Sequence, residues 1–198
     1  MDSSKSFSSD NYAGAHESVV RALVQANAGD ASAYGADPWT GQATAALRDA
    51  FGARGGVFFV FTGTGANVLG LSLLLRPYEA VICPETAHVN VDECGAIERT
   101  LGNRLLAVAT PDGKLTPGLI APRLEGRGDE HRAQPRVVAI SQVTELGTCY
   151  TFDELKALRE FYEWDPSAHV VRWMTAFDTA ETDVDAFVAD VHQTAGRE

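Results

Sequence analysis

The sequence predicts an α/β fold: a partial three-layer sandwich in which helices cover both faces of a mostly parallel sheet. Short apolar runs with strand character alternate with amphipathic stretches of helical period along most of the chain. This alternation is typical of parallel sheets, because a crossover helix connects successive parallel strands. The pattern changes after residue 160 and predicts a small C-terminal α+β piece. We therefore expect one part over residues 1–160 and another over 161–198.

Each element of the sandwich has its own local signal. Thr151, followed three residues later by Glu154, predicts a capping box at a helix start, and Gly102 predicts a helix stop. The predicted strands are 57–61, 80–83, 104–109 and 136–142. The predicted helices are 14–27, 41–51, 66–75, 92–101, one that begins at Thr116-Pro117, and 152–159, with a loop over 33–40. In the C-terminal piece we expect strands over 161–166 and 169–177 and a helix over 182–192.

The composition excludes several classes of function. The chain has 198 residues, 45% of them hydrophobic, and a net charge of −11, which disfavours nucleic acid and anionic membranes as partners. No apolar run is long enough to cross a bilayer, and the polar start shows no secretory signal, so we expect a cytoplasmic protein. The three cysteines are widely spaced and predict reduced thiols and no metal site.

The most informative local pattern is the glycine-rich turn Thr62-Gly63-Thr64-Gly65. It lies between the apolar run 57–61 and the helix predicted over 66–75. The free backbone N–H groups at a helix start, with the positive end of the helix dipole, bind anions well. The turn therefore suits a phosphate group. A plain strand-to-helix connection that uses two glycines for close packing explains the pattern equally well.

Several ordered motifs together resemble the threonine aldolase and β-eliminating lyase family. The matching stretches are 7–14, 33–38, 61–67, 76–95, 113–117, 141–150 and 171–179. The resemblance implies a pyridoxal-phosphate enzyme of the aspartate-aminotransferase fold, with the incomplete large domain over 1–160 and the end of the small domain over 161–198. It also implies an amino acid substrate such as threonine, cleaved to glycine and an aldehyde, and a homo-oligomer.

The resemblance also assigns roles to residues of the predicted cofactor site. Gly63, Thr64 and Gly65 are expected to hold the cofactor phosphate, and His88 to stack on the pyridine ring. Glu93 and Glu145 stand at acidic active-site positions, although other branches of the family carry histidine where Glu145 stands. On residue type alone, His88 is interpreted as a surface or core histidine, and both glutamates as solvated charges.

A second group of residues is expected to reach the substrate. Ser9 and Arg172 are predicted to clamp its carboxylate, for which the planar guanidinium fork of arginine is well suited. Tyr34 resembles a loop residue that reaches a partner subunit's site. One departure is visible, because Ala36 replaces an acidic residue common in that loop. For Arg172, the alternative is that it faces solvent on its strand.

The largest departure from the family concerns lysine. Pyridoxal chemistry needs a lysine to hold the cofactor as a Schiff base and a carboxylate to keep the ring nitrogen protonated. The lysines here are Lys5, Lys114 and Lys156, and none lies in the family's lysine context. Family members are nearly twice as long, and the missing block falls between about Arg159 and Phe161. We expect no covalent cofactor at the family position.

Two functions from different classes follow. The family resemblance favours a threonine aldolase, with a β-eliminating lyase for aromatic amino acids as a weaker variant. The missing lysine favours a non-catalytic truncated remnant that at most binds phosphate or a partner chain. For the 198 residues alone, we expect little or no aldolase activity.

Overall fold

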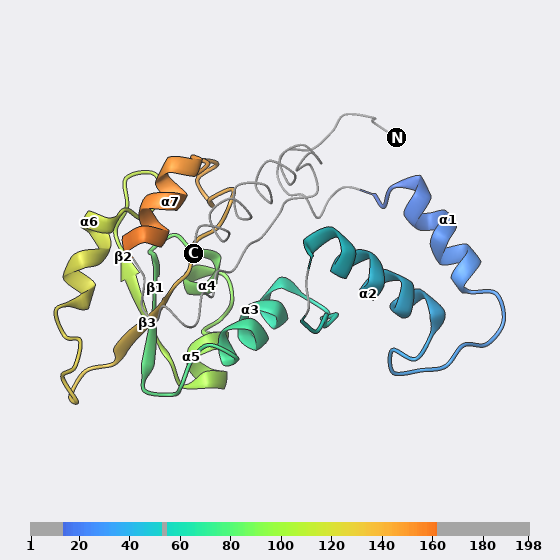
Figure 1. Cartoon of the computed structure of the whole chain (residues 1–198), viewed down its shortest axis with the longest axis horizontal. Coiled ribbons are helices and arrows are strands. Elements are labelled where there is room, and N and C mark those ends of the chain that lie inside the picture. Colours follow the sequence, from blue (N-terminus) through green and yellow to red (C-terminus); the bar gives the residue numbers. More distant parts are fainter. Residues whose placement is uncertain (1–13, 53–54, 162–198) are drawn as a thin grey trace. The chain divides into compact units, whose positions relative to one another are not determined.

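A computed structural model describes residues 14–52 and 55–161 (Figure 1). The chain forms two compact units, residues 1–58 and residues 59–198. We call them the N-terminal and C-terminal units and describe each by itself. The elements predicted over 161–166, 169–177 and 182–192 lie outside the described residues, apart from Phe161, and stay predictions.

Two helices make up the described part of the N-terminal unit. Helix α1 spans Glu17–Ala26 and helix α2 spans Pro38–Phe51. The loop predicted over 33–40 is too long at its end, because Asp37 caps α2: its Oδ1 accepts the Thr40 N–H at 2.8 Å. Pro38 then occupies the first helical position, where a missing N–H costs nothing.

A parallel sheet is the centre of the C-terminal unit and confirms the predicted fold class. In the described residues its order is β2-β1-β3, with β1 over Glu79–Pro84, β2 over Arg104–Val108 and β3 over Gln134–Val138. Both neighbours pair with β1 in parallel. The apolar residues of β1 are buried on both faces of the sheet, as expected for a central parallel strand.

Alternation along β1 divides the core into two layers. Val81 packs with Leu71 of α3 (Gly63–Ser72) and Ile97 of α5 (Ala96–Leu101) on one face. The next residue, Ile82, packs on the other face with Ile120 and Leu158. The latter two belong to α6 (Pro117–Ile120) and α7 (Phe152–Phe161). Helices thus cover both faces, and the three-layer prediction is confirmed (Figure 1).

Two short elements complete the described part, and helix α5 begins later than predicted. Helix α4 spans His88–Val91, and the 3₁₀ turn η2 spans Ala121–Leu124. The helix predicted over 92–101 begins only at Ala96. Its predicted first turn is broken because Cys94 and Gly95 both adopt positive φ, at 52° and 67°, which an α-helix does not permit.

The strand predicted over 57–61 is wrong. Residues 57–61 form no strand, and Phe58, Phe59 and Phe61 are exposed. The apolar run has strand propensity, but a strand also needs a neighbour to accept and donate its backbone hydrogen bonds. Nothing in the described part of the chain pairs with this segment. The helix that follows it begins at Gly63, three residues earlier than predicted, because Thr62 serves as its N-cap.

The predicted capping box of α7 is present and is joined to the loop before α6. Glu154 Oε2 accepts the Thr151 N–H at 2.7 Å, and Thr151 Oγ1 accepts the Glu154 N–H at 3.2 Å. Glu154 Oε1 lies 2.6 Å from Lys114 Nζ. The hydrogen bond from Lys114, followed by that from the Thr151 backbone, lowers the pKa of Glu154 to about 2.

This ion pair predicts a pH-dependent part of stability. A carboxyl whose pKa is lowered on folding stabilises the fold above its ordinary pKa, and that contribution disappears as pH falls from about 4.5 to about 2. We expect Lys114→Met to lower stability at neutral pH and to lose less stability than wild type over that acid range. Urea unfolding curves at several pH values would measure it. Arg99→Met on α5 is the control; two variants with parallel pH curves would contradict the assignment.

Candidate functional site

A cavity of about 240 Å³ lies at the carboxyl ends of β1 and β3 in the C-terminal unit. Ligands of open parallel sheets bind at this end of the strands, where the connecting loops diverge. Its lining comes from the start of α3, from the segment after β1 and from the segment after β3. The lining residues are Gly63, Asn67, Ala87, His88, Val89, Glu93, Ala139, Ile140, Ser141, Val143 and Glu145.

Burial on either side holds His88 at the cavity. Its neighbours Ala87 and Val89 are buried and pack with Cys83 at the end of β1. The imidazole therefore faces outward, and its side chain is 54% exposed. Burial raises the pKa of the Cys83 thiol to about 12, so this cysteine is a residue of the core and does not act as a nucleophile.

Three side chains form a hydrogen-bonded chain beside the cavity. His88 Nδ1 lies 2.9 Å from Glu93 Oε1, and the Asn67 amide nitrogen donates to the same oxygen. The Glu93 side chain is fully buried. Because Oε1 accepts from the amide, we assign it as acceptor from His88 as well. The hydrogen of the neutral imidazole then lies on Nδ1, and Nε2 keeps a free lone pair.

Glu145 joins the segment after β3 to the start of α4. Its Oε1 accepts the His88 backbone N–H at 2.9 Å and the Ser141 hydroxyl at 2.9 Å. The structure therefore brings His88, Glu93 and Glu145 together at one cavity, as the resemblance implied. The two glutamates differ in environment, since Glu93 is buried beneath the imidazole and Glu145 is exposed at the rim.

The predicted phosphate turn forms the start of α3, and Gly63 lines the cavity. Thr62 Oγ1 accepts the Gly65 N–H at 3.2 Å, while the N–H groups of Gly63 and Thr64 belong to the first helical turn and have no intrahelical acceptor. A Cβ at Gly63 would meet no atom within 4 Å of the described chain. Packing therefore does not require glycine there, whereas close approach of a ligand would.

Three predicted substrate contacts are not part of this cavity as described. Tyr34 lies in the N-terminal unit, where its side chain is fully exposed and its φ is 60°. Ser9 and Arg172 lie outside the described residues. The roles of all three stay predictions.

Asn67 is the site residue that our sequence reasoning missed. It is buried in the apolar stretch of α3 beside Val68 and Leu71. An amide among apolar residues, one helical turn after a glycine-rich helix start, was the available signal. A single polar residue in such a helix is common, however, and its partner Glu93 lies 26 positions away in the sequence.

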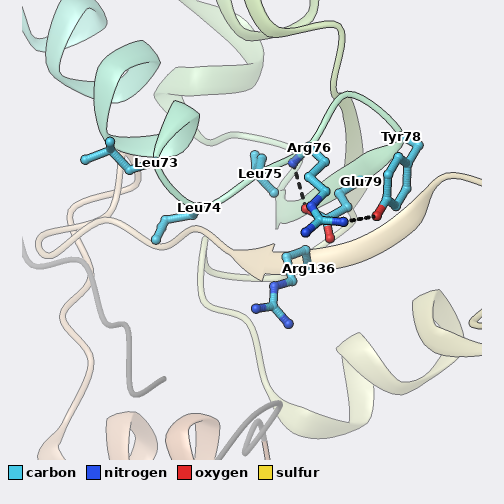
Figure 2. A pocket seen from close by; sticks show the side chains of 7 residues that line it. All are labelled: Leu73, Leu74, Leu75, Arg76, Tyr78, Glu79 and Arg136. Atoms are coloured by element: carbon cyan, nitrogen blue, oxygen red, sulfur yellow. Dashed lines mark hydrogen bonds between the residues drawn. The ribbon is translucent and has the colours of Figure 1, made fainter. Parts of the chain in front are cut away.

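A second cavity, of about 310 Å³, lies near the amino end of β1, away from these groups (Figure 2). Three of its polar residues are bonded to one another: Arg76 Nη1 donates to the Tyr78 hydroxyl at 3.2 Å, and Glu79 Oε2 accepts the Arg76 backbone N–H at 2.7 Å. The Tyr78 hydroxyl and the Glu79 charge raise the pKa of Arg76. Because these groups are already engaged, we favour the first cavity as the functional site.

Comparison with known proteins decides the family. The sequence model of the β-eliminating lyase family matches residues 6–165. The chain belongs to the β-eliminating lyase family. Members of this family are dependent on pyridoxal phosphate, as the resemblance implied. The glycine-rich turn, His88, Glu93 and Glu145 all lie within the matched residues.

Relatives of this β-eliminating lyase family chain include two bacterial enzymes named low specificity L-threonine aldolase. That of Pseudomonas aeruginosa is 47% identical and that of a Pseudomonas species 48% identical, each over 158 residues. Each alignment covers 79% of this chain and 46% of the relative, so the chain spans about half the length of the curated relatives it matches.

A solved structure supports the same fold. The chain resembles the threonine aldolase of Leishmania major with a TM-score of 0.70 and 33% sequence identity, over 75% of this chain and 44% of that one.

In the described residues no helix is long and apolar enough to cross a membrane, and no cluster of histidine, cysteine and acidic side chains suits a metal ion.

Proposed function

We propose that this chain carries the cofactor-facing part of a threonine aldolase, which cleaves a β-hydroxy-α-amino acid to glycine and an aldehyde. The observation that carries the proposal is the meeting of the α3 start with His88 and Glu93 at the carboxyl end of the sheet. The aldolases of Pseudomonas support it, because they are 47% and 48% identical over 158 residues, which is 79% of this chain.

The residues of the cavity suit non-covalent binding of pyridoxal phosphate. Gly63 and Thr64 offer backbone N–H groups to a phosphate, and the flat imidazole of His88 suits the ring. The cofactor, when bound, supplies an electron sink for the charge left on the substrate's Cα. No lysine lines the cavity among the described residues, because Lys114 is bonded to Glu154 and Lys156 lies on α7. The described part of the cavity therefore offers no lysine for covalent attachment of the cofactor as a Schiff base.

The chain's own residues supply orientation and one proton site. Glu93 holds the imidazole of His88 through Nδ1, which leaves Nε2 as the atom that takes up or releases a proton. Val89, Ile140 and Val143 form the apolar wall of the cavity and reduce its contact with water. Glu145 fixes the position of the His88 backbone against the segment after β3.

The alternative function, a non-catalytic remnant, is favoured by the charges of the cavity. Its lining includes two carboxylates, Glu93 and Glu145, and no lysine or arginine among the described residues. A phosphate bound there is attracted by backbone N–H groups and the helix dipole alone, which are weak next to an ion pair. Such a chain would bind cofactor or a partner chain weakly without turnover.

We retain the remaining expectations as part of the proposal. Residues 1–160 form the large-domain part and 161–198 the small-domain end, with a central segment missing after about Arg159. Ser9, Arg172 and Tyr34 contact the amino acid substrate. The protein acts in the cytoplasm, in amino acid metabolism, as a homo-oligomer. The acidic net charge of −11 supports the absence of nucleic acid and membrane partners.

Titration with pyridoxal phosphate, followed by absorbance and fluorescence, tests the seat. We expect weak saturable binding that Gly63→Asp lowers by about tenfold or more, because a carboxylate then stands where the phosphate binds. Asp is favourable at a helix start, so the loss would not come from unfolding. Gly70→Asp, the same change within α3, is the matched control. Equal affinities for the two variants would contradict the phosphate site.

A further inference from the structure

Asn67 is a buried polar residue with a role that the proposed function does not yet include. Its side chain lies against Glu93, and the residue is 5% exposed. It stands four positions after Gly63 on α3, so both residues lie on the same side of the helix. Both line the cavity.

We propose that Asn67 is a positioning residue which, through Glu93, fixes the orientation and the tautomer of His88. This inference rests on the proposed function of the same cavity. The residue does not touch the reacting atoms in this account. It acts on the imidazole by holding the carboxylate that the imidazole contacts.

The sharing of one oxygen carries this inference. Glu93 Oε1 accepts a hydrogen bond from the Asn67 amide and also lies 2.9 Å from His88 Nδ1. The other oxygen, Oε2, has no hydrogen-bond partner among the described residues. These two contacts are therefore what holds the carboxylate in place. The terminal torsion of glutamate is broad, so without the amide the carboxylate is free to turn away from the imidazole.

Comparison with a second buried asparagine separates positioning from plain structural support. Asn103 donates to the carbonyls of Arg76 and Glu79 at 2.5 and 2.9 Å and stabilises the backbone around the start of β1. Asn67 makes no such backbone contact with its amide, and its own Oδ1 is buried without a partner in the described part of the chain. Buried unpaired acceptors are costly, and each one calls for an explanation.

Asn67 also connects two parts of the proposed cofactor seat. The helix that offers the Gly63 N–H to a phosphate carries, one turn later, the amide that orients Glu93 and hence His88. A rigid helix between the two fixes the distance from the phosphate site to the ring site. A substitution that removes the Asn67 amide should therefore change the orientation of the imidazole without moving the helix start.

Side-chain ¹⁵N NMR of the unliganded 198-residue chain tests the proposal directly. The ¹⁵N signals of the His88 ring are assigned by their absence from the spectrum of His88→Gln. We expect these signals to show mainly the Nδ1–H tautomer in the wild type. Asn67→Leu, which removes the donor at similar size, should shift His88 to the Nε2–H tautomer that a neutral histidine side chain prefers in water. Asn90→Leu is the matched control, because this exposed amide of α4 contacts the Glu85 carbonyl and not Glu93.

Each outcome decides the matter. A mainly Nε2–H His88 in wild type, or an unchanged Nδ1–H majority in Asn67→Leu, overturns the proposal. If Asn67→Leu fails to melt cooperatively, Asn67→Ala replaces it: this smaller change removes the same donor and should give the same tautomer shift. Pyridoxal phosphate titration separates the two claims. A tautomer shift in a chain that binds no cofactor would sustain the positioning role and refute the proposed function.

Discussion

Borohydride reduction after incubation with pyridoxal phosphate is expected to leave no stoichiometric adduct on any single lysine of this chain. A Schiff base requires a free amine beside the cofactor aldehyde. The Lys114 ammonium lies 2.6 Å from Glu154, and this hydrogen bond raises its pKa, so the free amine is scarce. Lys156 lies on α7 and does not line the cavity. Lys5 lies outside the described residues.

The same reasoning predicts threonine cleavage no faster than a blank without protein. Lysine placement supplies a positive control: Val143→Lys puts an amine at the cavity wall, and we expect single-site trapping there. Val91→Lys makes the same change at an exposed position of α4 that does not line the cavity. Mass spectrometry of the reduced proteins measures the adducts. A stoichiometric adduct on one native lysine, or cleavage of threonine by the purified protein, would refute the prediction that this chain is inactive.

Self-association through the segment 57–61 is the second large effect that we expect. Phe61 is fully exposed and Phe59 is 56% exposed, and they stand two positions apart on a segment that pairs with no strand of the described residues. Burying a fully exposed phenylalanine contributes about 1.5–3 kcal/mol, and the half-exposed Phe59 about half of that, so the two contribute about 2–4.5 kcal/mol. We expect Phe59→Ser with Phe61→Ser to weaken self-association by about 30-fold to about 10³-fold, since each 1.4 kcal/mol is a factor of ten.

Sedimentation velocity over a range of protein concentrations measures this effect. The control removes similar apolar surface at separate sites, by Leu73→Ser with Phe152→Ser, two other exposed positions of the C-terminal unit. Contiguous apolar surface favours association more than isolated residues do. A sharp monomer peak for the wild type at all concentrations would count against the prediction, as would equal effects of the two double variants.

Local sequence signals predicted most elements in the described part of the C-terminal unit correctly. Strand β1 was identified because four apolar residues precede Pro84, and α7 because Thr151 and Glu154 form a capping box. Predicted element ends were less accurate. The positive φ of Cys94, a residue type that rarely adopts it, shortened a predicted helix by four residues.

The residues of the candidate site were predicted as a group, but their connections were not. The motifs placed His88, Glu93 and Glu145 in one site, and all three line one cavity. The contact between Asn67 and Glu93 joins residues 26 positions apart, and the contact between His88 and Glu145 joins residues 57 apart. Neither follows from local spacing, because both depend on how the segments after β1 and β3 meet.

The sequence by itself determined the fold class, the family resemblance and the absence of a lysine in the family's context, since periodicity, motifs and residue identity are local properties. Only the tertiary structure decided that 57–61 forms no strand, because pairing depends on a neighbour that propensity cannot supply. It also decided that Glu93 is buried beneath His88 with Asn67 beside it. Burial and hydrogen-bond partners are set by which faces of α3 and the sheet come together, and that is a property of the packed chain.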